Sequence, residues 1–124
     1  MLAYVDPTEQ LVAEIFVRDI KRSKDFYCRL GFELLRDDDT FVVLGWEDHQ
    51  LFLDQHTDVP TAPVFPQANI RVMVPNVDDY WKLAEEIGAP VLNPIGDRRY
   101  GLRDFTILDP DGFGVRFGSR LSPS

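Results

Sequence analysis

Residues 100–117 have the sequence YGLRDFTILDPDGFGVRF, and this stretch decides the fold. β-Branched and aromatic residues before position 109 favour a strand, and the DPDG run at 109–112 is typical of a tight turn. The proline of that run fixes φ at the first central position, and the glycine tolerates the positive φ that closes the turn. Val115 and Phe117 then alternate with small or charged residues. The stretch therefore predicts two strands with one apolar face.

The elements before this pair of strands repeat an earlier set at a constant offset of 57 positions. Residues 10–17 alternate as a strand, and residues 20–30 carry apolar side chains at helical spacing. The same pattern recurs over residues 69–74 and 77–87. The matched positions include both helix caps and both glycine stops: Val17 and Val74, Asp19 and Asn76, Ile20 and Val77, Phe26 and Leu83, Leu30 and Ile87, Gly31 and Gly88, Leu35 and Leu92. The interpretation is a duplicated module.

Three strands are expected after each helix, so the predicted fold class is α+β, with two βαβββ modules whose curled mixed sheets surround a cleft. The chain is interpreted as a single domain, 1–124. Module one is expected over about 10–56, a proline-rich linker over about 57–67 and module two over about 68–120. In module two the first strand after the helix is predicted only for Val91 and Leu92. Residues 1–9 show no period and are expected to form an irregular arm.

The composition of the chain argues against some classes of function. The chain has 124 residues, of which 44% are hydrophobic and 27% charged, as in an ordinary soluble globule. It has no apolar run long enough for a membrane helix and no signal-peptide pattern. The single cysteine, Cys28, fits a reducing cytoplasm, and we interpret it as a small apolar helix residue. A net charge of −8 argues against nucleic acid, and it suits either a cationic small ligand or simple solubility.

Two segments resemble signatures of the vicinal oxygen chelate superfamily, which includes glyoxalase I, dioxygenases, and fosfomycin and bleomycin resistance proteins. Residues 17–32, VRDIKRSKDFYCRLGF, are similar to the first-helix signature that ends FYxxxLGF, with two residues here in place of three between Tyr27 and Leu30, and the DPDG run is similar to the second-module turn. The likeness covers about residues 10–120. Within the superfamily, YGLRDF at 100–105 resembles the WGxxEF pattern of the bleomycin resistance branch, with Tyr for Trp and Asp for Glu. The acidic run at 37–39 points the same way, although a solvated turn explains it as well.

This resemblance also implies where a metal ion would be held, because the family's metalloenzymes use His, Gln or Glu on the first and last strands of each module. The corresponding positions here are Val12, Phe52, Asn69 and Arg116. Two of these side chains offer no ligand, the amide is a weak one, and the arginine places a cation where the ion would lie. A register slip of two would bring Gln50 or Asp54 to the position of Phe52. We therefore predict no metal and no cofactor.

Without an ion, the cleft is predicted to be an aromatic pocket of mixed charge. The candidate ligand-binding residues are Phe16, Phe41, Phe52, Asp54, Arg71, Met73, Tyr100 and Arg116. Such a pocket suits a flat, partly cationic molecule that stacks on the rings. The two arginines favour a carboxylate or phosphate group on that molecule, or they pair with Glu14 or Asp54 across the cleft. An equally good interpretation of Phe41 and Phe52 is that they belong to the core.

Bleomycin resistance proteins are homodimers that sequester a basic glycopeptide, so the resemblance implies a homodimeric, antibiotic-resistance type of binding protein with no catalytic residues, and the single cysteine predicts that it is cytoplasmic. The drug need not be bleomycin. The alternative is a metal-dependent glyoxalase or dioxygenase-type enzyme of the same superfamily. A third hypothesis is a metal-free enzyme with Glu14 or Asp54 as general base. His49 and His56 flank predicted turns and are expected to be solvated, and no Ser-His-Asp arrangement is visible.

Overall fold

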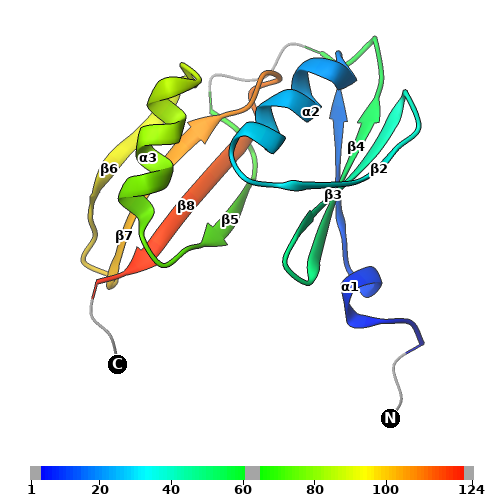
Figure 1. The fold of residues 1–124 in the computed structure, drawn as a ribbon. Helices are drawn as coiled ribbons and strands as arrows, with labels where there is room; N and C mark the ends of the chain where they lie inside the picture. The colour runs from blue at the N-terminus through cyan, green and yellow to red at the C-terminus, as the bar shows by residue number, and fades with distance from the viewer. Residues whose placement is uncertain (1–3, 61–64, 122–124) are drawn as a thin grey trace. The chain divides into compact units, whose positions relative to one another are not determined.

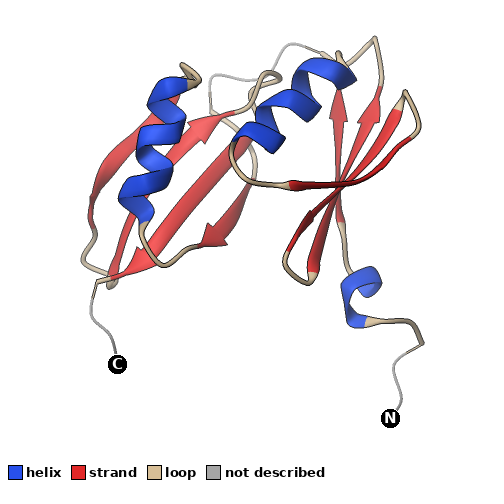
Figure 2. Ribbon diagram, in the orientation of Figure 1, coloured by secondary structure: helices blue, strands red, loops and turns tan. Residues whose placement is uncertain are grey.

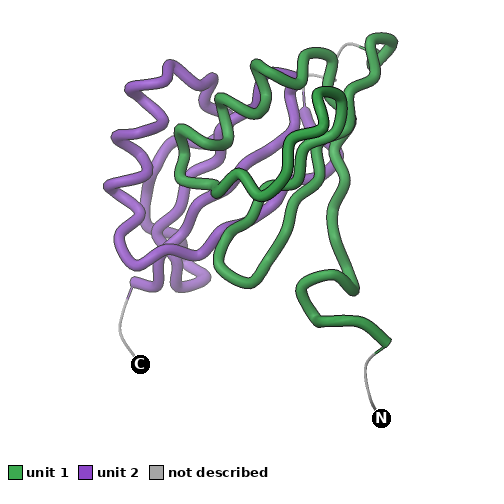
Figure 3. The backbone as a smooth tube through the Cα atoms, turned by 45° about the vertical axis from the view of Figure 1, so that its right-hand side comes forward, with its two compact units in different colours: residues 1–60 green, residues 61–124 purple. Residues whose placement is uncertain are grey.

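The chain divides into two compact units, residues 1–60 and residues 61–124, in a computed structural model that describes residues 4–60 and 65–121 (Figure 3). Each unit has its own four-stranded sheet and a ten-residue helix. Figure 2 shows these helices in blue beside the red strands. Of the predicted linker over 57–67, residues 61–64 lie outside the described part of the chain, as do residues 1–3 of the predicted arm.

The first unit opens with a single helical turn, α1 (Pro7–Gln10), in the stretch that was predicted to be irregular. Asp6 caps this turn, because its carboxylate accepts a hydrogen bond from the backbone N–H of Thr8 at 2.9 Å. Pro7 stands at the first helical position, where its missing N–H costs nothing. The prediction of an irregular arm is therefore wrong for residues 7–9, and the strand predicted from residue 10 begins only at Ala13. A helix this short cannot show the 3.6-residue period that the sequence analysis relied on.

The sheet of the first unit has the strand order β1-β4-β3-β2 (Figure 1). Its strands are β1 (Ala13–Val17), β2 (Glu33–Asp37), β3 (Phe41–Trp46) and β4 (His49–Gln55), and β1 pairs with β4 in parallel. The helix α2 (Ile20–Arg29) is capped by Asp19 and is followed by Gly31 at a φ of 111°. Parallel pairing of β1 with β4 requires a crossover connection, and α2 belongs to it.

The second unit repeats this topology with the order β5-β8-β7-β6. Its elements are β5 (Asn69–Met73), α3 (Val77–Glu86), β6 (Val91–Asp97), β7 (Leu102–Leu108) and β8 (Gly114–Arg120). Helix α3 lies along one face of its sheet (Figure 1), where Tyr80 stacks on Phe117 with 5.0 Å between ring centroids. The α+β fold of two βαβββ modules is thus confirmed.

Strand alternation separates the faces of both sheets. In the first unit Ile15, Val17, Leu51 and Leu53 are buried on the helix side, and Ala13 of the same face is exposed where β1 begins. In the second unit the buried side chains of β7 and β8 are Phe105, Ile107, Val115 and Phe117. Each fully buried apolar side chain contributes about 1.5–3 kcal/mol to stability. The side chains that alternate with these residues along each strand point to the opposite face of the sheet.

The DPDG turn between β7 and β8 forms as the sequence predicts. One carboxylate oxygen of Asp109 accepts hydrogen bonds from the backbone N–H groups of Asp111, at 2.9 Å, and Phe113, at 2.8 Å. Gly112 has a φ of 86°, a conformation that L side chains rarely adopt. The predicted two-residue strand at Val91 is too short, because β6 continues to Asp97 through two register shifts. Its Pro94 is tolerated because β6 is an edge strand.

None of the helices in residues 4–60 and 65–121 is long and apolar enough to cross a membrane.

Candidate functional site

The face of the first sheet that lies opposite the buried core residues carries four of the predicted site residues. Phe16 and Phe41 are register partners of Asp54 from either side, and Phe52 lies in the next row of the same face. The rings of Phe41 and Phe52 approach edge to face, with 5.3 Å between centroids. The rings of Phe41 and Phe52 are half-buried, so each is partly exposed to solvent, and Phe16 is 53% exposed.

A titratable cluster occupies the same face. His56 Nε2 lies 3.3 Å from a carboxylate oxygen of Asp54, and its ring contacts Phe16 edge to face at 4.9 Å. Hydrogen bonding to Asp54, helped by desolvation and by the charge of Asp54, raises the pKa of the Glu14 carboxyl above its ordinary value. His56 is exposed, as expected of a solvated histidine, and it also contacts Asp54 and Phe16. β1 and β4 pair in parallel, and this register brings the groups together.

The corresponding face of the second sheet carries the other predicted residues. Arg71 and Arg116 are register partners across β5 and β8, and Met73 pairs with Gly118 one row along. Tyr100 lies in the loop between β6 and β7. Its hydroxyl donates a hydrogen bond to Asp104 of β7, and Asp104 is the register partner of Gly118 on this face. The predicted set of eight residues therefore divides into four on each unit.

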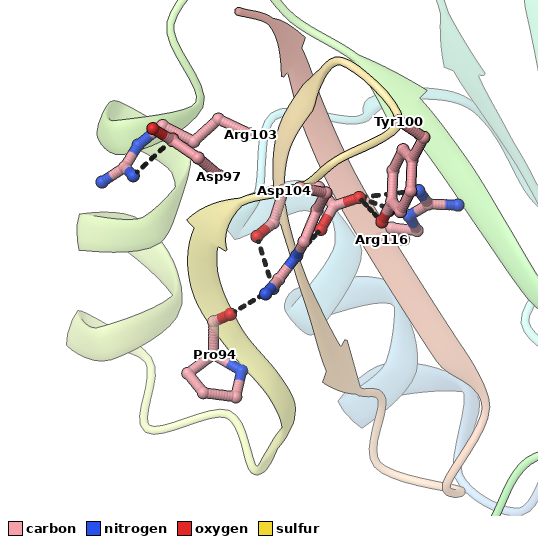
Figure 4. Close-up of polar contacts among 7 residues, drawn as sticks. Pro94, Asp97, Tyr100, Arg103, Asp104 and Arg116 are labelled. Atoms are coloured by element: carbon pink, nitrogen blue, oxygen red, sulfur yellow. Dashed lines mark hydrogen bonds and ion pairs between the residues drawn. The ribbon is translucent and has the colours of Figure 1, made fainter.

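Asp104 is the centre of a polar cluster on this second face (Figure 4). Its side chain is 1% exposed and accepts four side-chain hydrogen bonds, from Arg98 Nε at 2.8 Å, Tyr100 Oη at 2.6 Å, and Arg116 Nη2 and Nε at 2.6 and 3.1 Å. Arg98 also donates to the backbone oxygen of Pro94. The guanidinium of Arg116 lies over the Tyr100 ring, 5.5 Å from its centroid. The cluster thus links β6, β7, β8 and the loop that carries Tyr100.

These contacts keep the cluster charged. Burial acts to raise the pKa of Asp104, but the hydrogen bonds from Arg98, Tyr100 and Arg116 outweigh it and leave that pKa below its ordinary value. Desolvation likewise acts to lower the pKa of Arg116, and its bonds to Asp104 raise it. The carboxylate is therefore ionised at neutral pH, and its two arginine partners are oriented before any ligand arrives.

This arrangement corrects the predicted partners of Arg116. Pairing with Glu14 or Asp54 was one of the two predicted roles of Arg116, and the structure instead pairs Arg116 with Asp104 of its own module. Arg71 is exposed and forms no ion pair or hydrogen bond with another described residue. Tyr100 and Asp104, the first and fifth residues of the YGLRDF segment, bind each other, but the segment does not show that Arg116 joins them.

A cavity of about 770 Å³ adjoins the cluster in the second unit. Its walls include Phe65, Asn69, Asn93, Tyr100, Thr106 and Arg116. Its volume falls within the range of small-molecule sites, and its lining combines apolar surface with a few polar groups, as such sites do. Tyr100 and Arg116 were predicted as ligand-binding residues and line this cavity. Arg71 and Met73 do not line it, although they share its sheet face.

The residues at the family's metal positions do not fit a divalent ion. Val12 and Phe52 have no donor atom, and Asn69 offers only a neutral amide. Arg116 is a permanent cation that already pairs with Asp104. Among the residues that the structure describes, no group of three or more His, Cys, Asp or Glu side chains is arranged to hold a metal ion.

Paired βαβββ modules with mixed four-stranded sheets define the fold class of the glyoxalases. The chain belongs to the Glyoxalase/Bleomycin resistance protein/Dioxygenase superfamily, whose family model matches residues 8–117. No curated protein sequence is detectably similar to it.

Solved structures share this fold at low sequence identity. A glyoxalase/bleomycin resistance protein/dioxygenase from Alicyclobacillus acidocaldarius is 21% identical, with a TM-score of 0.75 and 94% of this chain and 95% of that chain covered. A bleomycin resistance determinant encoded on the transposon Tn5 is 20% identical, with a TM-score of 0.70 and 93% and 100% covered. A fosfomycin resistance protein from Listeria monocytogenes is 13% identical, with a TM-score of 0.75 and 96% and 94% covered. These likenesses establish the fold and do not select one branch of the superfamily.

Proposed function

We propose that this protein binds a small organic molecule without a metal ion, in the manner of the drug-sequestering members of its superfamily. The observation that carries the proposal is the state of Arg116. It occupies the family's ligand position on the last strand, it is fixed by a buried carboxylate, and it faces a cavity large enough for a drug-sized ligand. A cation held there disfavours a divalent ion and leaves the cavity to an organic guest.

Each sheet face, taken by itself, offers contacts to a ligand. The first carries the aromatic rings of Phe16, Phe41 and Phe52 beside the carboxylates of Glu14 and Asp54, which suits a flat, partly cationic group. The second offers the exposed ring of Tyr100 at the cavity wall. A homodimer in the cytoplasm is part of the proposal, and light scattering after size-exclusion chromatography tests the dimer.

Calorimetric titration of the metal-free protein with a bleomycin, in the presence of a chelator, tests the proposal. Saturable heat is expected, and a panel of flat heterocycles extends the search if bleomycin is the wrong drug. Tyr100→Ala removes the stacking ring and is expected to weaken binding about 2- to 12-fold, the equivalent of one aromatic pair.

Tyr100→Phe is the matched variant, because it keeps the ring and removes only the hydroxyl that reaches Asp104. It is expected to bind nearly as well as the wild type. Absence of saturable binding across the whole panel contradicts the proposal.

A further inference from the structure

Four polar side chains form a continuous row across the second sheet. Asn93 of β6 is the register partner of Thr106 of β7, Thr106 is the partner of Arg116 of β8, and Arg116 is the partner of Arg71 of β5. Paired residues of neighbouring strands point to the same face and lie about 5 Å apart. Asn93, Thr106 and Arg116 line the cavity, so most of this row borders the space where a ligand fits.

Some hydrogen-bond donors in this row have no partner among the described residues. Arg116 uses Nε and Nη2 toward Asp104 and Tyr100, which leaves both N–H groups of Nη1 without a partner among the described residues. Thr106 is only 6% exposed, lines the cavity, and forms no side-chain hydrogen bond to another described residue. A hydroxyl in that position gains from a ligand that completes its hydrogen bonding.

The charge on this face is positive even though the chain as a whole carries −8. Asp104 is the acidic member of the cluster, and Arg98 and Arg116 both pair with it. Arg71 adds a third cation at the end of the row, where it has no acidic partner among the described residues. Three guanidinium groups against one carboxylate leave a local excess of positive charge, which attracts anions from solution.

We propose that this row binds an oxyanion of the ligand, such as the carboxylate of a planar aromatic acid, in an inference that rests on the proposed function. Arg116 Nη1, the Thr106 hydroxyl and the Asn93 amide donate hydrogen bonds to the oxyanion. Arg71 strengthens the attraction through its charge, and the Tyr100 ring at the cavity wall stacks on the planar part of the ligand. Arginine is suited to this role because its planar fork matches a carboxylate.

Titration of the full-length protein followed by ¹H–¹⁵N correlation spectra tests the inference with three probes: sodium benzoate, benzamide and inorganic phosphate. Benzoate is expected to give saturable shifts of backbone amides in β7 and β8, and benzamide, which has the same shape without the charge, is expected to bind at least about ten-fold more weakly. Displacement of benzoate by phosphate identifies a general oxyanion site, and its failure identifies a carboxylate site. Both results support the inference.

Two variants make the test specific. Thr106→Val keeps the side-chain shape and is expected to weaken benzoate binding about ten-fold through the lost hydrogen bond. Arg71→Gln is expected to weaken it about three-fold. Arg120→Gln removes an equal charge from an exposed position at the end of β8 and is the matched control, with no change expected.

The outcomes separate this inference from the proposed function. Equal binding of benzoate and benzamide overturns the oxyanion site while leaving a small-molecule cavity in place. Unchanged benzoate binding by both Thr106→Val and Arg71→Gln overturns it as well. If no probe binds and the drug panel also gives no heat, the proposed function fails together with the inference.

Discussion

Asp104 sits at the junction of three strands and a loop, and its carboxylate satisfies two guanidinium groups and a phenol. Removing one member of a buried ion pair is costly because the remaining charge keeps its desolvation without its partner. Here the arginine side chains are about a quarter exposed, so part of that cost is relieved by water. The residue therefore contributes to stability and also holds Arg116 in place at the cavity.

Asp104→Asn is expected to lower the free energy of unfolding by about 3 kcal/mol, because the two arginines lose their shared charge. Urea denaturation followed by circular dichroism measures it. Asp97→Asn is the control, since Asp97 forms an exposed ion pair with Arg103 at 3.0 Å and is expected to cost less than about 1 kcal/mol. Equal effects of the two substitutions would mean that the Asp104 cluster is not a stabilising unit.

The pH dependence of stability follows from the same residue. The folded-state pKa of Asp104 is lowered from 3.8, so its contribution is fully present above that value and is lost as pH falls through the folded-state pKa. The stability gap between wild type and Asp104→Asn is therefore constant at neutral pH and closes in acid. Denaturation of both proteins across this pH range measures the gap, and a gap that persists in strong acid would contradict the assignment.

Sequence patterns predicted some residues of the site and missed others for a physical reason. Tyr100 and Arg116 were predicted, because one lies in a recognisable segment and the other alternates along a regular strand. Thr106 and Asn93 were missed, because their placement depends on the pairing of β6 with β7, and register shifts in β6 cannot be read from alternation. Arg116 was given the wrong partners because the pairing of Asp104 with it requires strand register.

At the scale of elements, the duplicated caps and stops were the most predictable features. Asp19 and Asn76 cap α2 and α3 through their side chains, and Gly31 and Gly88 follow the two helices with φ values of 111° and 68°. These signals are local, so they do not depend on packing. The short helix α1 and the extension of β6 past Pro94 were not predicted, because a single turn has no period and proline disfavours most strand positions.

The two caps give a matched pair of predictions. Asp19→Ala and Asn76→Ala each remove a side-chain acceptor from a helix N-terminus, and each is expected to cost about 1 kcal/mol of unfolding free energy. Chemical denaturation measures both. A cost several times larger for one substitution than for the other would mean that the two N-caps do not stabilise their helices equally, and it would contradict this prediction.

The pairing of β5 with β8 depends on a close approach at Gly114. A Cβ there would lie 2.7 Å from the Cβ of Asn69, a cavity residue. Gly114→Ala is therefore expected to destabilise the protein by about 1–3 kcal/mol and to weaken ligand binding by displacing Asn69. Thermal unfolding and the benzoate titration measure the two effects.

For the whole molecule, family membership and function are separate conclusions. The family model places the chain in the Glyoxalase/Bleomycin resistance protein/Dioxygenase superfamily, and the fold alone does not choose between an enzyme and a binding protein. The proposal of a metal-free binding protein rests on four side chains. Val12 and Phe52 have no donor atom and Asn69 offers only a neutral amide. Arg116 is a cation that pairs with Asp104. The account therefore depends on a chain that recognises its ligand without an ion.

Equilibrium dialysis against zinc, manganese, iron(II) and nickel, followed by elemental analysis and by titration of the dialysed protein with its ligand, tests this claim most directly. We expect no stoichiometric ion after dialysis and the same ligand affinity with and without a chelator. One tightly held divalent ion per chain, whose removal abolishes ligand binding, would contradict the account.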